Sequence, residues 1–398
     1  MQPNQTGKKG FESLTKNLFL INGLTALAYA FILPVMSTFL VDHLNAPPVY
    51  IAIYSVGFAV SGLIFSQWFG QLADKGRSKK QLFLLSMSSI FLSAVAFYNT
   101  SQIWQALLIG LVLMGAGHAS IPQLLAMIRV HAVASGKDSA RLNSQMRSAV
   151  SIVWIVGPPS AFILIDKFGF KFNFVLSAII TLFVFAFSLA RLPAFKVLPP
   201  VASSLQEKPL ITGRVCLLGA AIFFSNAANS IYITAMPLYL IREMETPVYL
   251  PGLLLGITSV FEIPVMLVSA ALCRKYGKYN LMLFGYACAI IFYALFQIVS
   301  ETYMFLLVQL FNGLFFGIFI GLAITIVQDA MPDRVGFASA FYSNVMRLGM
   351  MAGVSLVGLV AQLSSFKLAL FGCLGCAVLA ALLMLAAWRL ESIQVASA

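Results

Sequence analysis

The stretch Asn143–Phe162, which reads NSQMRSAVSIVWIVGPPSAF, sets the pattern on which the whole chain is built. It is an apolar span with an arginine near its start and a Gly-Pro-Pro sequence near its end. In a helix, Arg147, Ser151 and Trp154 would share one face, because they are spaced four and three residues apart. Such a polar face on an otherwise apolar helix is expected to contact protein or a water-filled cavity. The pattern returns about two hundred residues later at Ser343–Arg347.

The composition is that of a membrane protein. Of the 398 residues, 60% are hydrophobic and only 10% are charged, and the mean hydropathy is +0.93. Soluble globular proteins carry about 25% charged residues, so this chain is not suited to water. Apolar runs long enough to cross a bilayer, which takes about 20 residues per helix, recur along the sequence. The predicted class is an all-α polytopic membrane protein.

The positive charge follows a membrane topology. The chain has 25 lysines and arginines against 13 acidic residues, a formal net charge of +12. With the N-terminus inside the cell, only four basic residues fall outside the cytoplasmic segments: Lys167, Lys171, Arg242 and Lys367. This positive-inside bias predicts that both termini are cytoplasmic. It accounts for the net charge without a nucleic-acid partner.

Twelve apolar spans are predicted, in two sets of six. The first set is 17–41, 49–72, 81–99, 103–131, 143–165 and 172–191, and the second is 213–241, 249–272, 281–299, 303–328, 338–362 and 367–389. The proline-rich stretch 192–212 separates them and is predicted to be a cytoplasmic linker. The predicted domains are therefore an N-terminal six-helix bundle at 1–191 and a C-terminal six-helix bundle at 213–398.

The two halves repeat each other. Pro48–Tyr50 matches Pro247–Tyr249, and the short basic turn Asp74–Arg77 matches Lys275–Lys278. Parallel six-helix repeats, related by an axis along the membrane normal, are typical of major facilitator transporters, whose binding site lies near the midplane between the halves. The predicted fold is therefore a major facilitator fold in two pseudo-symmetric halves.

Glu262 is the acidic residue that the sequence places deep inside a span, about midway through 249–272. An ionised carboxylate there costs about 2.5–3.5 kcal/mol on insertion scales, so it should face a cavity, find a partner or stay protonated. Thr258, Ser259 and Ser269 share its helical face and support a polar lining. One interpretation is a proton carrier or sugar-binding group; the other is a structural carboxyl bonded to a neighbouring helix.

Several neutral polar residues also lie in predicted spans. His118 is expected near the midplane of the fourth span, either as a hydrogen-bonding group in the cavity or as a packing residue of the bundle. Amides beside aromatic rings suit a sugar, because the amides satisfy hydroxyls while a ring stacks on the C–H face. Asn229 and Tyr232 fit that description, but amides such as Asn312 also join helices to each other. The glycines Gly313, Gly317 and Gly321 are spaced for close helix contact.

Charged residues near the predicted cytoplasmic ends suggest a gate. Arg147 and Arg347 occupy the first turns of the fifth and eleventh spans, and Asp329 and Asp333 flank the loop before the eleventh. These groups are expected to form a charge network that closes the inside of the transporter. The alternative is that the arginines extend to the lipid headgroups. The candidate network comprises Asp74, Arg77, Arg129, Arg147, Asp329 and Arg347.

No enzyme motif is present in the sequence. It has no Walker loop, zinc-ligand spacing, GxSxG elbow or dinucleotide fingerprint, which predicts a protein that is not an enzyme and needs no cofactor or metal. The five cysteines lie in or at the ends of apolar spans, so Cys373 and Cys376 are interpreted as packing residues. The energy for transport is therefore expected to come from an ion or substrate gradient, with Glu262 as the coupling acid.

The chain resembles the sugar efflux transporter family of the major facilitator superfamily. The resemblance is carried by motifs in both halves: Pro122-Gln123-Leu124, Met146-Arg147, Trp154–Pro159, Met236-Pro237-Leu238, Glu262-Ile263-Pro264, Gln309–Asn312, Gln328-Asp329 and Asn344 with Arg347. It implies a proton-driven exporter of mono- and disaccharides, such as lactose or glucosides, in the bacterial inner membrane. Two departures from the family pattern, His118 in place of an amide and Ala235 in place of an acid, bear on the choice of sugar.

The prediction is a monomeric twelve-helix sugar exporter that works by alternating access with proton antiport. The predicted substrate-binding residues are His118, Gln123, Trp154, Asn229, Tyr232, Glu262 and Asn312. An alternative is a multidrug proton antiporter of the same fold, which the 34 phenylalanines would also suit. A membrane sensor with a transporter fold is a third possibility, but it would call for a sizeable cytoplasmic domain or tail.

Overall fold

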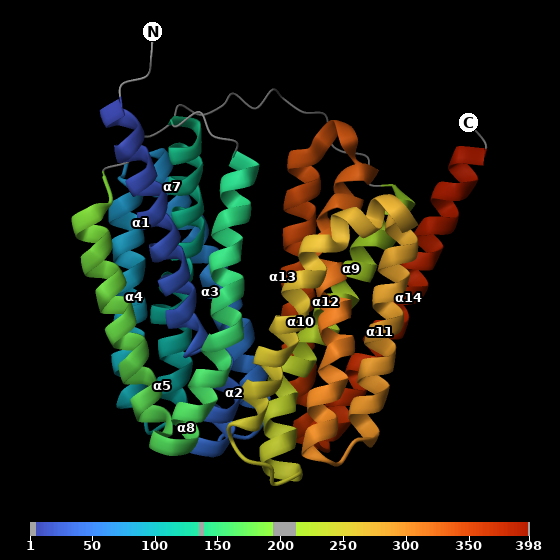
Figure 1. Cartoon of the computed structure of the whole chain (residues 1–398). Coiled ribbons are helices and arrows are strands. Elements are labelled where there is room, and N and C mark those ends of the chain that lie inside the picture. The colour runs from blue at the N-terminus through green and yellow to red at the C-terminus, as the bar shows by residue number, and fades with distance from the viewer. Residues whose placement is uncertain (1–4, 135–138, 194–211, 397–398) are drawn as a thin grey trace. The chain divides into compact units, whose positions relative to one another are not determined.

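The structure is a computed structural model that describes residues 5–134, 139–193 and 212–396. The chain forms two compact units, one of residues 1–46 and 53–203 and the other of residues 47–52 and 204–398. Most of the predicted linker lies outside the described residues. Each unit is a bundle of long helices, blue to green in the first and yellow-green to red in the second (Figure 1).

Helices account for nearly all of the described residues. Up to Arg191 they are α1 (Gln5–Ala30), α2 (Met36–Thr38), the π-helical turn η1 (Phe39–His43), α3 (Val49–Asp74), α4 (Lys79–Tyr98), α5 (Ile103–Leu108), the π-helical turn η2 (Ile109–Met114), α6 (Gly115–His118), α7 (Ser120–Ala134) and α8 (Ser139–Arg191). After Thr212 they are α9 (Gly213–Leu238), the π-helical turn η3 (Tyr239–Glu243), α10 (Leu250–Tyr276), α11 (Lys278–Ile298), α12 (Thr302–Ala330), the 3₁₀ turn η4 (Pro332–Arg334), α13 (Val335–Leu363) and α14 (Phe366–Ala396).

Helices form most of each of the twelve predicted spans. In the described part of the chain, ten helices are long and apolar enough to cross a membrane. One of them, Ile152–Arg191, has 40 residues and contains two predicted spans on either side of Gly169, where φ is 78° and ψ is 173°. The first predicted span, 17–41, is not among the ten because α1 ends at Ala30 and the helix resumes at Met36. Counted this way, the described helices supply the twelve spans of the predicted major facilitator fold.

The repeat is reproduced in backbone detail. The π-helical turns η1 and η3 end in equivalent backbone hydrogen bonds. Leu44 N–H donates to Phe39 O at 3.1 Å in the first half, and Met244 N–H donates to Tyr239 O at 3.1 Å in the second. The residue after each has a left-handed conformation, with φ of 51° at Asn45 and 52° at Glu245. These non-glycine residues are uncommon in that region, so the match is specific.

The structure corrects one register of the sequence alignment. The turn that starts the next helix is closed by Tyr50 N–H donating to Pro47 O, and in the second half by Leu250 N–H donating to Pro247 O. Pro247 therefore corresponds to Pro47, one residue before the match expected from the Pro-Val-Tyr sequences. The bond pattern of the turn, rather than side-chain identity, sets this equivalence.

Glycines bring α10 and α12 into close contact, as their spacing predicted. A Cβ atom placed on Gly313 would lie 2.4 Å from Phe261 Cβ, and one on Gly317 would lie 2.6 Å from the Glu262 carbonyl oxygen. A Cβ on Gly321 would collide with the Ser269 side chain. Each glycine therefore admits a turn of α10, which confirms the predicted close packing.

Polar groups join helices at both ends of the bundles. In the first half, Lys80 Nζ donates to Leu189 O at 2.8 Å and to Leu192 O at 2.5 Å, which satisfies carbonyls at the C-terminal end of α8. In the second half, the Glu243 carboxylate accepts from Phe366 N–H at 2.6 Å and Lys367 N–H at 3.2 Å, at the start of α14. A carboxylate there complements the positive end of the helix dipole.

Candidate functional site

A buried polar network occupies the interior of the second half. Its centre is Gln309 of α12, which is fully buried. Gln309 Oε1 accepts from Tyr232 Oη of α9 at 3.2 Å and lies 2.8 Å from Thr258 Oγ1 of α10. Asn312 Nδ2, one turn further along α12, is 3.3 Å from Thr258 Oγ1 and 3.4 Å from Gln309 Oε1. The network therefore joins α9, α10 and α12 through side chains that are at most 8% exposed.

The network has one unused acceptor. Asn312 Oδ1 is buried and has no hydrogen-bond partner among the described residues. A buried carbonyl oxygen without a donor costs about 1–3 kcal/mol, so this position favours a donor supplied from elsewhere. A sugar hydroxyl could supply one if the interior opened.

Aromatic rings surround the tyrosine of this network. The Tyr232 ring is 1% exposed and meets Phe292 at 5.2 Å and Phe296 at 5.4 Å between centroids, both edge-on, with Tyr293 at 6.3 Å. Edge-to-face pairs at these distances are favourable. In this state of the protein, Tyr232 and Asn312, both predicted to bind substrate, lie inside the second half rather than at an exposed surface.

Glu262 lies on α10 next to the glycine-lined contact with α12. Its side chain is half-buried, and its backbone carbonyl faces Gly317. The hydroxyls expected to share its face are bonded within their own helix, since Ser259 Oγ donates to Leu255 O at 3.1 Å and Ser269 Oγ donates to Met266 O at 2.7 Å. Thr258 connects that face of α10 to α12 through its hydroxyl, which lies 2.8 Å from Gln309 Oε1.

The remaining predicted binding residue of the second half is Asn229. It lies on α9 one turn before Tyr232, and its side chain is half-buried. The neighbouring Asn226 is 4% exposed and donates to Ile222 O at 3.1 Å, so its amide returns to its own helix. Of these two amides, Asn229 is the more accessible one.

In the first half, His118 lies at the end of α6 and packs against α3. Its ring meets Phe58 edge-on, with the centroids 5.7 Å apart. A Cβ atom on Gly62 would come within 3.2 Å of the His118 ring, so this glycine makes room for the imidazole. The half-buried ring therefore lies between α6 and α3.

Gln123 and Trp154 differ in accessibility. Gln123 of α7 is 3% exposed, and its Oε1 has no hydrogen-bond partner among the residues that the structure describes. Trp154 of α8 is 36% exposed. Gln123 thus resembles Asn312 in holding a buried amide oxygen that lacks a donor, whereas Trp154 presents an aromatic surface.

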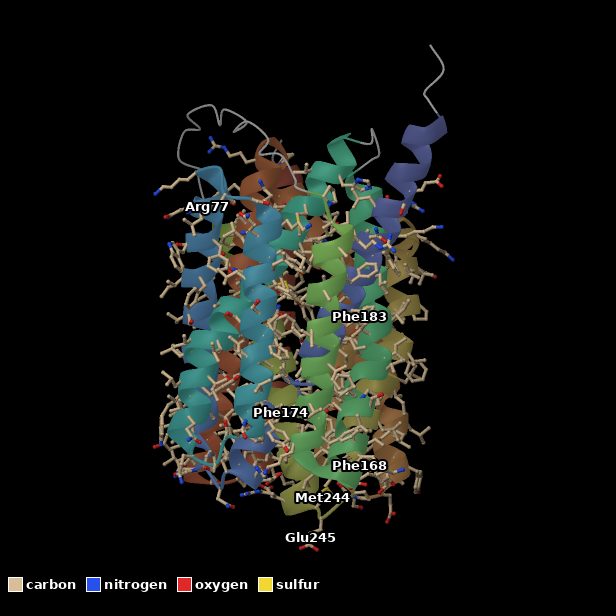
Figure 2. The ribbon with its side chains drawn as sticks, turned by 90° about the vertical axis from the view of Figure 1, so that its left-hand side faces the viewer. Arg77, Phe168, Phe174, Phe183, Met244 and Glu245 are labelled. Atoms are coloured by element: carbon tan, nitrogen blue, oxygen red, sulfur yellow. The ribbon has the colours of Figure 1, made fainter. Side chains whose placement is uncertain are left out.

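The predicted gating residues are only partly described. The side chains of Asp74, Arg129 and Arg147 lie outside the described part of the structure. Arg77 is exposed at the end of the first half opposite Phe168 (Figure 2), and Arg347 is exposed on α13. Asp329 pairs with Lys278, not one of the predicted arginines, at 3.2 Å between Oδ2 and Nζ.

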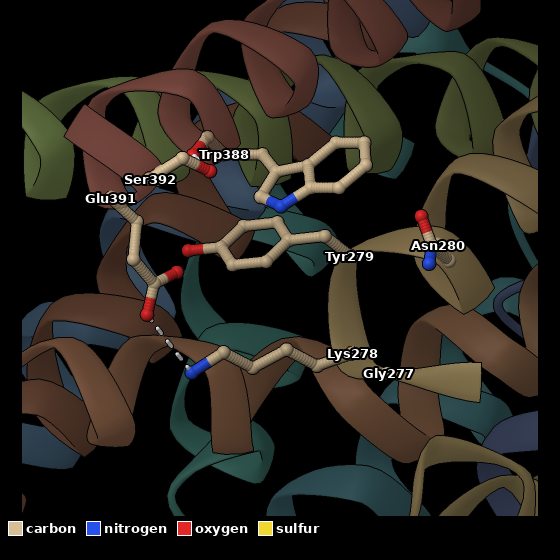
Figure 3. A pocket seen from close by; sticks show the side chains of 7 residues that line it. All are labelled: Gly277, Lys278, Tyr279, Asn280, Trp388, Glu391 and Ser392. Carbon is tan, nitrogen blue, oxygen red and sulfur yellow. Dashed lines mark hydrogen bonds and ion pairs between the residues drawn. The ribbon is translucent and has the colours of Figure 1, made fainter. Parts of the chain in front are cut away.

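Sequence reasoning missed a charged and aromatic cluster at one end of the second half. Arg214 Nη2 lies 2.9 Å from Glu391 Oε1. Lys278 Nζ lies 3.5 Å from the same oxygen (Figure 3). Arg214 also donates to Tyr279 Oη at 3.2 Å, and the Tyr279 ring stacks on Trp388 at 6.2 Å and 11°. One feature of the sequence could have indicated this cluster: Arg214, Lys278, Asp329 and Glu391 lie at the ends of four different spans, on the same predicted side of the membrane. We name Arg214, Lys278, Tyr279, Trp388 and Glu391, together with Asp329, the end cluster.

Comparison with known proteins identifies the family. Residues 18–302 and 218–396 match the Major Facilitator Superfamily. The chain is 31% identical to sugar efflux transporter A of Dickeya chrysanthemi, over 89% of this chain and 90% of that protein. It is 31% identical to sugar efflux transporter B of Salmonella typhimurium, over 92% and 93% respectively. It is 30% identical to sugar efflux transporter C of Escherichia coli, over 95% and 98%.

Solved structures agree on the fold. The crystal structure of the nucleoside transporter NupG superposes with a TM-score of 0.77 at 16% identity, and covers 94% of this chain and 99% of NupG. The peptide-transporter-family protein PepTSo gives a TM-score of 0.76 at 12% identity, over 96% and 98%. The chain is a multi-pass membrane protein that belongs to the Major Facilitator Superfamily and, within it, to the sugar efflux transporters.

Proposed function

We propose that this protein exports small sugars from the bacterial cytoplasm by proton antiport and alternating access. The observation that carries the proposal is the 30–31% identity, over 89–95% of the chain, with three proteins named as sugar efflux transporters. Membership of a transporter family also makes transport, rather than catalysis, the activity to expect. The positive-inside charge bias supports an inner-membrane orientation with both termini cytoplasmic.

The chemistry of the buried network supports a sugar as the substrate. A sugar offers hydroxyls that both donate and accept. Such hydroxyls suit the buried amide oxygens of Asn312 in this network and of Gln123 in the first half, which lack a donor among the described residues. Asn229 and Trp154 add an accessible amide and an aromatic surface. Tyr232 would take part when the second half opens, because its ring is enclosed by other aromatic residues.

Glu262 is the residue we assign to proton coupling. Its carboxyl is half-buried within a candidate span, where an ionised form is costly, so binding of a proton and binding of a polar substrate would compete there. In an exporter, a proton entering from outside would displace the sugar, and its release inside would reset the site. The carboxyl needs no cofactor for either step.

Counterflow in proteoliposomes tests the proposal. Purified protein would be assayed with radiolabelled lactose and glucose, with a pH gradient imposed or absent. We expect sugar movement that the gradient accelerates, and a Glu262→Gln variant that exchanges sugar but no longer responds to the gradient. Glu301→Gln is the matched control, because Glu301 is an exposed carboxylate at the start of α12.

Two results would contradict these assignments. Proton-driven export that is undiminished in Glu262→Gln would remove Glu262 as the coupling residue. The absence of sugar movement under any gradient, combined with gradient-driven movement of a lipophilic cation, would favour the multidrug antiporter instead.

A further inference from the structure

The end cluster borders a pocket that lies within the second half alone. The pocket has a volume of about 530 Å³ and is lined by Gly277, Lys278, Tyr279, Asn280, Trp388, Glu391 and Ser392 (Figure 3). All of these residues come from the start of α11 and the end of α14 or directly precede α11. The pocket therefore lies between two helix ends, and it uses none of the predicted substrate-binding residues.

The depth of the pocket is fixed by the two spans that meet there. Lys278 is the first residue of the candidate span Lys278–Ile298, and Ser392 is the last residue of the candidate span Phe366–Ser392. A position where two spans end is at the level of the lipid headgroups. The aromatic pair fits this depth, because tyrosine and tryptophan are enriched where the hydrocarbon region meets water.

The charges of the pocket are balanced rather than basic. Lys278 Nζ lies 3.2 Å from Asp329 Oδ2 and 3.5 Å from Glu391 Oε1, and Arg214 pairs with Glu391 at 2.9 Å. Two cations and two carboxylates thus form one neutral cluster. A ligand with a net negative charge would gain from Lys278 but would be repelled by Glu391, and a ligand with a net positive charge would meet the reverse. A ligand with one charge of each sign complements both groups.

The Glu391 carboxylate has room for a further donor. It interacts with Arg214, Lys278 and the Tyr279 hydroxyl, and because two carboxylate oxygens offer about four lone-pair sites, one site is left. Lys278 carries three N–H donors, of which the two ion pairs use two. The cluster thus has capacity for one further acceptor near Lys278 and one further donor near Glu391.

The same two helices offer surface for acyl chains. On α11, Phe284 is 53% exposed and Ile291 is 43% exposed, and on α14, Leu382 is 57% exposed and Leu390 is 37% exposed. A phospholipid can contact such side chains with its tails while its headgroup occupies the polar pocket. A water-soluble molecule from the cytoplasm would contact only the polar pocket and not these apolar side chains.

We propose that this pocket is a binding site for the headgroup of a zwitterionic phospholipid that carries a primary ammonium, namely phosphoethanolamine. Its phosphate accepts from Lys278, and its ammonium donates to Glu391 and lies beside the Trp388–Tyr279 pair, where a cation is attracted to the ring faces. A phosphocholine headgroup has no N–H to donate, and a phosphoglycerol headgroup has no cation, so neither satisfies both ends of the pocket.

Native mass spectrometry of protein released from nanodiscs tests the site. Phosphatidylethanolamine, phosphatidylcholine and phosphatidylglycerol with identical acyl chains would compete in one mixture, and the lipid retained on the intact protein would be counted. We expect phosphatidylethanolamine to be retained preferentially. In Lys278→Gln the preference should fall roughly tenfold, as expected for the loss of one charge-assisted hydrogen bond.

A second variant and a control separate binding from folding. Asn280→Ala combined with Ser392→Ala removes two polar side chains of the pocket, which donate to the Tyr276 and Trp388 carbonyl oxygens on exposed helix surface, but leaves every ion pair of the end cluster intact. It should therefore lower the preference and change the melting temperature less than Lys278→Gln does. Tyr276→Ala is the matched control, because Tyr276 is a 52% exposed aromatic residue at the end of α10 with Lys275 5.1 Å from its ring, and it does not line the pocket. Equal retention of the three lipids would overturn the proposal. So would a preference that Lys278→Gln and the double variant both leave unchanged.

Discussion

At the scale of single residues, the glycines of α12 show how little space separates two helices. Because a Cβ on Gly317 would lie 2.6 Å from the Glu262 carbonyl oxygen and 2.8 Å from Val265 Cβ, an added methyl group must push α10 away. We expect Gly317→Ala to lower stability by about 1–3 kcal/mol, the usual cost of overpacking. The measurement is the melting temperature in detergent.

Gly375 is the matched control for that substitution. It lies inside α14 and has no heavy atom within 4 Å of the position where a Cβ would be. Gly375→Ala should therefore be neutral or slightly stabilising, since alanine favours a helix by about 1 kcal/mol over glycine. Equal melting temperatures for the two variants would contradict the close contact between α10 and α12.

His43 is a residue whose environment predicts a dependence on pH. Partial burial, and secondly the charge of nearby Lys171, lower the pKa of His43 below its ordinary value of 6.5. Its ring stacks on Phe39 with the centroids 5.3 Å apart and meets Phe170 at 5.4 Å. The folded protein prefers the neutral ring, so the unfolded chain takes up the proton first as the pH falls.

The protein should therefore become less stable as the pH falls. The contribution of His43 to stability is fully present above about pH 6.5 and is lost as the pH falls through 6.5 towards the lowered pKa. The melting temperature should therefore decline between pH 7.5 and pH 5, and the decline should be smaller in His43→Gln. A decline of the same size in the variant would show that other groups cause it.

At the scale of elements, position 43 has a counterpart in the second half that does a different job. The shared π-helical turns make Glu243 the equivalent of His43, and the Glu243 carboxylate caps the start of α14 by accepting from Phe366 N–H and Lys367 N–H. Glu243→Ala should cost about 1–2 kcal/mol through loss of this cap, and Glu243→Gln should cost less because an amide keeps one oxygen.

The measurement is the melting temperature of the Glu243 variants, compared with that of a variant at a neighbouring acidic residue. Glu245→Gln is the control, since Glu245 is exposed at the tip of the same turn (Figure 2). If Glu245→Gln lowered the melting temperature as much as Glu243→Ala, general electrostatics rather than the cap would account for the effect.

At the scale of the whole molecule, the sequence was sufficient for the architecture but not for the contacts between helix ends. Apolar run lengths and the repeat predicted twelve spans in two halves. Glycine spacing predicted close packing of the span that forms α12, and the structure identifies α10 as its partner. The break between α1 and α2 and the π-helical turns were not predicted, because a hydropathy pattern does not register a change of hydrogen bonding inside an apolar run.

The candidate site shows the same limit. Periodicity placed Tyr232 and Asn312 on helix faces, but only the fold reveals that these faces meet Gln309 inside one half. The end cluster was missed for the same reason: Arg214, Lys278 and Glu391 are far apart in the sequence, and each seemed to be an ordinary charge at the end of a span. Side chains whose partners come from distant segments cannot be paired from one sequence.

The orientation of the whole chain is open to direct measurement. In a variant that lacks the five native cysteines, Lys75→Cys should react with a membrane-impermeant maleimide only after the cells are opened, whereas Glu301→Cys should react in intact cells. Both positions are exposed, so accessibility alone does not distinguish them. Labelling of Lys75→Cys in intact cells would reverse the predicted topology.

The close contact between α10 and α12 has a mechanical consequence. Helix α12 runs without interruption from Thr302 to Ala330, 29 residues or about 43 Å. Since Gly317 touches the backbone at Glu262, the two helices cannot slide past each other independently at that level. If Glu262 takes up and releases a proton as proposed, a resulting shift of α10 should also move α12, whose far end carries Asp329 paired with Lys278. Rigid helix packing alone would then connect the membrane interior to the aqueous boundary.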